Sequence, residues 1–110
     1  MFDEKTEKKI NEAVTLEIVN AVKTHGADYN TNHEAYAVLL EEVEEAEKVL
    51  DYIKNHVAMI WDAVKVDDDN EVKSNSRIIA LDAVELAKES CQIAAVCRKI
   101  LGETENELHN

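Results

Sequence analysis

The chain contains no proline and only two glycines in 110 residues. β-Strands and hairpins depend on glycine, proline and Asn-Gly turns and on β-branched or aromatic runs, yet aromatic residues make up only 5% here. Alanine, leucine, glutamate and lysine are abundant instead, and all four are strong helix formers. We therefore predict an all-α fold, and a chain of this length is expected to form one domain over 1–110.

Apolar residues recur with a helical period of about 3.6 in three segments. The first helix is predicted over 1–24, the second over 33–65 and the third over 75–101, followed by a polar tail over 102–110. The acidic run 67–71 lacks the glycine and the bidentate acid at the places that a calcium loop requires, so we interpret it as a helix connection. The pattern predicts an antiparallel bundle of three to four helices.

The third segment repeats a large apolar residue every seven positions, and small residues flank this stripe. The repeated residues are Ile79, Leu86, Ile93 and Ile100. Three helices of this size leave wide apolar stripes uncovered. We therefore expect a homo-oligomer, a dimer or tetramer, in which the bundle cores are shared between chains.

The net charge of −12 comes from 24 acidic and 12 basic side chains. Such a chain repels phosphate backbones and anionic membrane surfaces, so we expect neither nucleic acid nor membrane as a partner. The sequence has no long apolar run and no secretory signal. Cys91 and Cys97 are too far apart along one helix for a disulfide, which is typical of a reducing compartment. A cytoplasmic location is the expectation.

Three glutamates, Glu41, Glu42 and Glu45, gather within little more than one turn of the second predicted helix. Like charges at these spacings cost roughly 0.2–0.5 kcal/mol per pair unless solvent or a cation screens them. On the third helix Glu89 and Gln92 lie near the apolar stripe, and antiparallel pairing brings Glu89 roughly level with Glu45. Oxygen donors of this kind suit Mg²⁺ or Mn²⁺. These five residues are the candidate metal ligands, although the spacing of the glutamates alone favours solvated carboxylates on a helical module.

The segment from His25 to Glu45 combines a glycine-containing loop with a predicted helix that carries the pattern Glu-Glu-x-x-Glu. This segment resembles the central part of small MazG-like proteins. These proteins are often encoded by phages and prophages and belong to the all-α nucleoside triphosphate pyrophosphohydrolases. The second motif of the family, Glu-x-x-Asp on the following helix, is matched at Glu89 but has Gln92 in the aspartate position. The resemblance covers about 25–101.

The resemblance implies Mg²⁺-dependent hydrolysis of a nucleoside triphosphate to a monophosphate and pyrophosphate, with Mn²⁺ as a possible substitute. It also implies a homo-oligomer that serves in nucleotide-pool housecleaning. Glu41, Glu42, Glu45 and Glu89 would hold the metal, and Glu42 or Glu45 would accept the proton of the attacking water. Because Gln92 is neutral and the gap between the motifs is longer than usual, the alternative is a MazG-like helical binding or assembly protein without hydrolase activity.

Four further residues are candidates for contact with the nucleotide. Asn30 lies in the loop before the acidic helix and is a candidate for the base or ribose, and His33 begins that helix. Lys48 is a candidate for a phosphate contact and Trp61 for stacking on a base. Three of the four also have a simpler interpretation: a helix-capping role for His33, a solvated surface position for Lys48 and a core position for Trp61.

Overall fold

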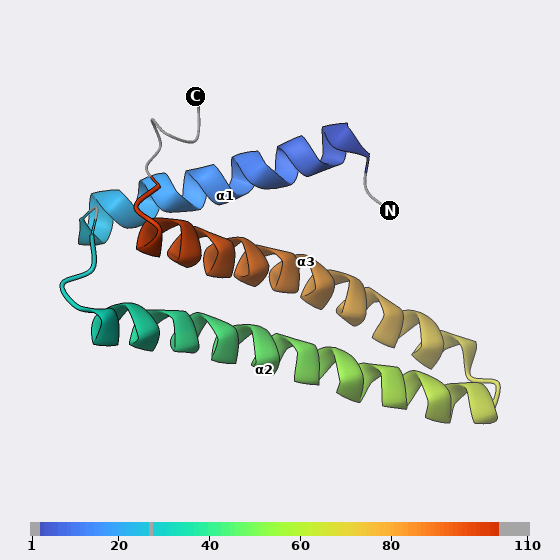
Figure 1. Ribbon diagram of the computed structural model, residues 1–110. Coiled ribbons are helices and arrows are strands. Elements are labelled where there is room, and N and C mark those ends of the chain that lie inside the picture. The colour runs from blue at the N-terminus through green and yellow to red at the C-terminus, as the bar shows by residue number, and fades with distance from the viewer. Residues whose placement is uncertain (1–2, 27, 104–110) are drawn as a thin grey trace. The chain divides into compact units, whose positions relative to one another are not determined.

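In the computed structural model the described residues, 3–26 and 28–103, form three α-helices and no strand. Helix α1 spans Glu4–His25, α2 spans Asn32–Lys65 and α3 spans Asp69–Ile100 (Figure 1). This confirms the predicted all-α class. None of these helices carries an apolar stretch of the length that a membrane crossing requires. The predicted tail falls within the described residues only as far as 103.

The chain divides into two compact units, and both α2 and α3 run through the boundary between them. The first unit comprises Met1–Val43 together with Ser90–Asn110, and the second comprises Glu44–Glu89. The first unit therefore holds all of α1, the beginning of α2 and the end of α3. The second holds the rest of α2 and α3 and the short connection between these helices.

The core of the first unit forms where α1 packs on the end of α3 (Figure 1). Val14 and Ile18 from α1 meet Ala95 from α3, and Ile18 is only 1% exposed. Burial of a side chain such as Ile18 stabilises the fold by about 1.5–3 kcal/mol. Ile10 lies on the same face of α1, since it precedes Val14 by four residues, but it remains 40% exposed.

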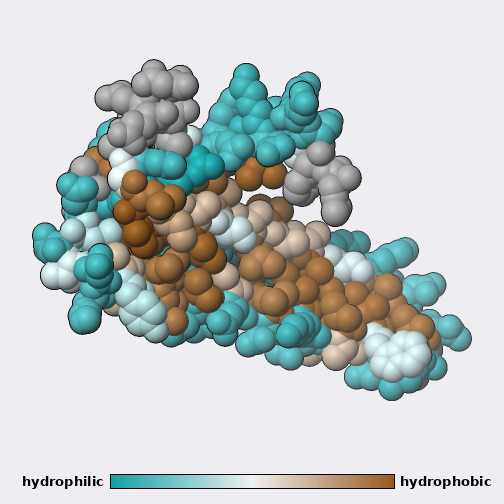
Figure 2. Space-filling model, in the orientation of Figure 1, coloured by the Kyte–Doolittle hydropathy of each residue, from teal (hydrophilic) through white to brown (hydrophobic). Residues whose placement is uncertain are grey.

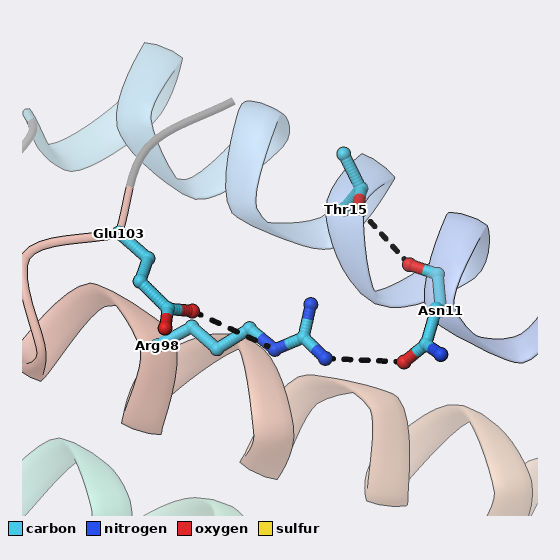
Figure 3. A network of polar contacts seen from close by, with 4 residues as sticks. All are labelled: Asn11, Thr15, Arg98 and Glu103. Atoms are coloured by element: carbon cyan, nitrogen blue, oxygen red, sulfur yellow. Dashed lines mark hydrogen bonds and ion pairs between the residues drawn. The ribbon is translucent and has the colours of Figure 1, made fainter. Parts of the chain in front are cut away.

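A polar link joins the same two helices (Figure 3). Arg98 of α3 donates a hydrogen bond from Nη2 to Asn11 Oδ1 of α1 over 3.1 Å. Its Nε lies 3.9 Å from a carboxylate oxygen of Glu103, the last described residue. Thr15 Oγ1 in turn donates to the carbonyl oxygen of Asn11. The contacts are exposed, so they fix the orientation of α1 more than they stabilise the fold.

Side-chain caps explain where the first two helices begin. Asp3 accepts a hydrogen bond from the backbone N–H of Thr6 over 2.8 Å at the start of α1. At the start of α2, Thr31 Oγ1 accepts from the N–H of Glu34, and the Glu34 carboxylate accepts from the N–H of Asn30. This reciprocal arrangement resembles a capping box, with Thr31 as the N-cap residue.

Helix α3 begins at Asp69 and not at residue 75, the predicted start. Asp68 Oδ1 accepts from the N–H of Glu71 over 3.1 Å and caps the helix, and the acidic side chains in the first turn interact favourably with the helix dipole. Asp67 adopts a positive φ of 55°, and the N–H of Asp68 bonds back to the carbonyl of Ala63. The acidic run therefore forms a tight turn and the first turn of α3.

In the second unit α2 and α3 lie antiparallel on either side of this turn, and most of their large apolar side chains are exposed. Only Ala63 and Asn75 are buried among its described residues. Trp61, Leu81 and Val84 are 61%, 72% and 63% exposed. Figure 2 shows hydrophobic side chains gathered along these helices. The interpretation of Trp61 as a core residue is therefore wrong within a single chain.

Candidate functional site

A cleft of about 590 Å³ lies within the first unit. Its walls come from α1, from the loop before α2, from the first turns of α2 and from the last turns of α3. The residues that line it are Glu17, Asn20, Ala21, Thr24, Tyr29, Glu34, Val38, Glu41, Glu42, Gln92, Ala95, Val96 and Lys99.

Four carboxylates line the cleft, and Glu41 and Glu42 from α2 and Gln92 from α3 are among its oxygen donors. These are three of the five predicted metal ligands. Mg²⁺ is usually held by one or two carboxylates together with water and substrate phosphates, and not by a cage of protein ligands. The chemistry of this donor set therefore fits a hard divalent cation.

The other two predicted ligands, Glu45 and Glu89, belong to the second unit. Burial, and then the negative charges of Glu85 and Glu45, raise the pKa of the Glu89 carboxyl group. Glu45 therefore lies close enough to interact with Glu89, as an antiparallel pairing of their helices predicts. Glu45 also pairs with Lys48 over 3.6 Å, an exposed contact that contributes little to stability. Among residues 3–26 and 28–103, no three acidic, histidine or cysteine side chains are grouped to hold a metal ion.

None of the four residues predicted to contact a nucleotide lines the cleft. Asn30 is exposed and uses its N–H at the start of α2, where His33 is also exposed. Lys48 lies in the second unit, as does Trp61, whose ring has Lys65 Nζ at 5.5 Å from its centroid. The cleft thus gives these residues no role.

Tyr29 and Lys99 also line the cleft, and the sequence did not single out either. Lys99 is 5% exposed, and its Nζ lies 4.2 Å from the centroid of the Tyr29 ring. Burial, followed by the negative charges of Glu34 and Glu42, raises the pKa of the Tyr29 hydroxyl, which therefore stays protonated and able to donate a hydrogen bond.

For two residues of the cleft, Glu34 and Lys99, helical spacing in the sequence could have indicated that they face the same way as the predicted ligands. Glu34 precedes Glu41 by two turns of α2, and Lys99 follows Gln92 by two turns of α3, so each pair shares a helix face. Tyr29 lies in a loop, where no periodicity indicates which way a side chain faces. Glu34 was interpreted only as a first-turn acid that favours the helix dipole.

Comparisons of this chain with protein-family models, curated proteins and solved structures found no match. The resemblance to MazG-like proteins therefore depends on the two acidic motifs and on the loop before the first. The cleft has to be interpreted from its own side chains: four carboxylates, the buried lysine Lys99 and the half-buried phenol of Tyr29.

Proposed function

We propose that this protein is a Mg²⁺-dependent nucleoside triphosphate pyrophosphohydrolase that acts on the cytoplasmic nucleotide pool. The observation that carries the proposal is a single cleft lined by Glu41 and Glu42 of the first acidic motif and by Gln92 of the second. In a chain with a net charge of −12, an acidic cleft attracts a divalent cation, and the cation reverses the local charge for an anionic substrate. Solvated carboxylates alone give no reason for both motifs to line one cleft.

The proposed ligands of the ion in this cleft are Glu41, Glu42 and Gln92, and the metal-binding roles of Glu45 and Glu89 stay predictions from the sequence. A bound Mg²⁺ would neutralise charge on the phosphates and lower the pKa of a bound water. Gln92 has no charge, so it is proposed to act through its carbonyl oxygen or by positioning a water molecule. This leaves the carboxylates of α2 as the main source of negative charge in the cleft.

In the proposed reaction a water oxygen attacks the α-phosphorus of the nucleotide. The bond from this phosphorus to the bridging oxygen breaks, and its electron pair leaves with pyrophosphate while the nucleoside monophosphate remains. A carboxylate accepts the proton of the attacking water. Glu42 is favoured for this role over Glu45, because Glu42 lines the cleft and Glu45 is paired with Lys48.

We also propose that the active form is a homo-oligomer, a dimer or tetramer, in which helices of several chains complete an antiparallel bundle and share its core. The support is the exposure of Trp61, Leu81 and Val84, each more than half accessible in the single chain. A second copy of the chain offers the same apolar face in a self-complementary arrangement.

The activity is tested by incubating the protein with a panel of standard and modified nucleoside triphosphates and Mg²⁺ while measuring pyrophosphate release. We expect turnover by the wild-type protein and a loss of about 100-fold or more in Glu42→Gln, since a general base contributes on this scale. Glu44→Gln is the matched control, because Glu44 is exposed on the same helix and does not line the cleft.

Two outcomes separate the candidate functions. No pyrophosphate release above that of Glu42→Gln, for any nucleotide, would rule out the hydrolase and leave the helical binding or assembly protein. Mg²⁺ or Mn²⁺ should raise the melting temperature of the wild-type protein but not that of Glu41→Ala, because only a site present in the folded state couples to stability. An equal shift in both proteins would contradict a metal site in the cleft.

A further inference from the structure

Lys99 is a buried cation that the proposed reaction has not used. Its side chain is 5% exposed and lines the cleft in the first unit. Lysine is almost never this buried unless a partner compensates its charge. Among the described residues, however, its ammonium group takes part in no ion pair. It lies against the ring of Tyr29.

The contact with Tyr29 does not itself use the N–H donors of Lys99. A ring face attracts the ammonium charge but accepts none of its three N–H donors in the way that an oxygen does. Four carboxylates, Glu17, Glu34, Glu41 and Glu42, line the same cleft from α1 and α2. Neither Glu17 nor Glu34 nor Glu41 forms an ion pair with Lys99. The donors of Lys99 are therefore available to a ligand that enters the cleft.

The hydroxyl of Tyr29 adds a second donor in the same part of the cleft. Tyr29 is half-buried, and Lys99 lies against the face of its ring. An ammonium group and a phenolic hydroxyl are suited to the oxygens of a phosphoryl group, whereas an acidic lining alone repels one. The cleft thus combines carboxylates for a cation with a cationic position for an anion.

We propose that Lys99 and Tyr29 form an anion subsite that binds the pyrophosphate portion of the substrate and of the product. This inference rests on the proposed function, because it is the hydrolase reaction that brings a polyphosphate into the cleft. Lys99 donates to non-bridging oxygens of the leaving pyrophosphate, and Tyr29 holds the ammonium group against the wall of the cleft. When a polyphosphate binds together with Mg²⁺, the ion interacts with the carboxylates of the cleft and the phosphate oxygens interact with Lys99.

The test measures the affinity for inorganic pyrophosphate in the presence of Mg²⁺ by calorimetry. Lys99→Met removes the charge and keeps the length of the side chain, and we expect it to weaken binding at least tenfold. Lys23→Met is the matched control with the same change, since Lys23 is exposed on α1 in the same unit and does not line the cleft. Unchanged affinity in a folded Lys99→Met would overturn the inference.

A measurement on the wild-type protein keeps the test decisive if Lys99→Met does not fold. Amine modification followed by mass spectrometry gives the reaction rate of each lysine. We expect magnesium pyrophosphate to slow modification of Lys99 several-fold while Lys23 reacts as before and Mg²⁺ alone has no such effect. Equal rates for Lys99 with and without bound pyrophosphate would overturn the inference.

The failures of the two proposals are distinguishable. Protection of Lys99 by pyrophosphate in a protein that hydrolyses no nucleotide would support the subsite and refute the hydrolase. The subsite would be refuted and the hydrolase would remain if the wild-type protein hydrolyses nucleotides while Lys99→Met leaves the affinity for pyrophosphate unchanged and magnesium pyrophosphate leaves the modification rate of Lys99 unchanged. A wild-type protein that binds no pyrophosphate refutes the subsite whatever its activity.

Discussion

Glu89 is a carboxylate whose surroundings disfavour its charge. Burial and the nearby charges of Glu85 and Glu45 raise its pKa, while Lys88 offsets only part of the effect. A carboxyl group with a raised pKa binds its proton more tightly in the folded state than in the unfolded state. Its contribution to stability is therefore complete below the unfolded pKa and is lost as the pH rises through the folded pKa. At neutral pH the ionised Glu89 is a local destabilising element that a cation would relieve.

Glu89→Gln should therefore stabilise the protein at neutral pH, because it removes this charge and keeps the shape of the side chain. We expect the melting temperature to rise by about 1–3 °C near pH 7.5 and to stay unchanged at a pH below the usual pKa of a glutamate. Thermal unfolding followed by circular dichroism at both pH values measures the difference. Glu47→Gln, at an exposed position of α2, is the control and should change little at either pH. A gain of equal size at both pH values would contradict the electrostatic explanation.

At the scale of the elements, a helix end could be predicted where the residue at that end is typical of a helix terminus and of little else, such as glycine after the last turn. Gly26 ends α1 with a positive φ of 85°, close to the predicted end at residue 24, and Thr31 caps α2. The start of α3 was placed too late, because several acidic residues in a row were interpreted as a loop although they favour a helix N-terminus. Asn75 and Ser76 look like caps in the sequence, but their side chains bond to carbonyl oxygens four residues earlier within the helix.

The candidate site was predictable only in part. The spacing of Glu41 and Glu42, and the position of Gln92, indicated residues that do line one cleft. Lys99 was missed because a lysine near the end of a helix is normally a solvated residue that favours the dipole. Lys99 is buried where α1 and α3 pack together in the first unit, next to Tyr29 from the loop before α2. No local pattern in α3 indicates either feature.

The cap of α2 positions the acidic helix, so it should be measurable in stability. Thr31→Ala removes the acceptor of the Glu34 N–H, and we expect the free energy of unfolding to fall by about 1 kcal/mol. Thr31→Ser keeps the hydroxyl and should retain most of the stability. Urea denaturation measures both variants against the wild-type protein. If the serine variant loses as much as the alanine variant, the hydroxyl cap is not the cause.

At the scale of the whole molecule, the two units differ in how much apolar surface they bury. The first unit has a small core around Val14, Ile18 and Ala95. The second consists of two helix segments and buries Ala63 but none of its large apolar side chains among the described residues. Isolated exposed apolar residues are normal on protein surfaces, but a row of them along neighbouring helices marks an interaction surface. The apolar period of the sequence was therefore informative about helices and stripes, but it did not indicate which residues of each stripe the folded chain buries.

Leu81 and Trp61 allow the shared core to be tested directly, since both lie in the second unit and are 72% and 61% exposed. We expect the wild-type protein to sediment as a dimer or tetramer at micromolar concentration and Leu81→Asp to sediment as a monomer, because a buried unpaired carboxylate at an interface is costly. Ser76→Asp adds the same charge at an exposed polar position of α3 and should leave the oligomer intact.

Trp61 is the only tryptophan of the chain, so its emission maximum reports on its surroundings. It should move to longer wavelength on dilution and in Leu81→Asp as the indole returns to water. A wild-type protein that sediments as a monomer, with the emission of a solvated tryptophan at every concentration, would show that these side chains are exposed in solution and that no core is shared.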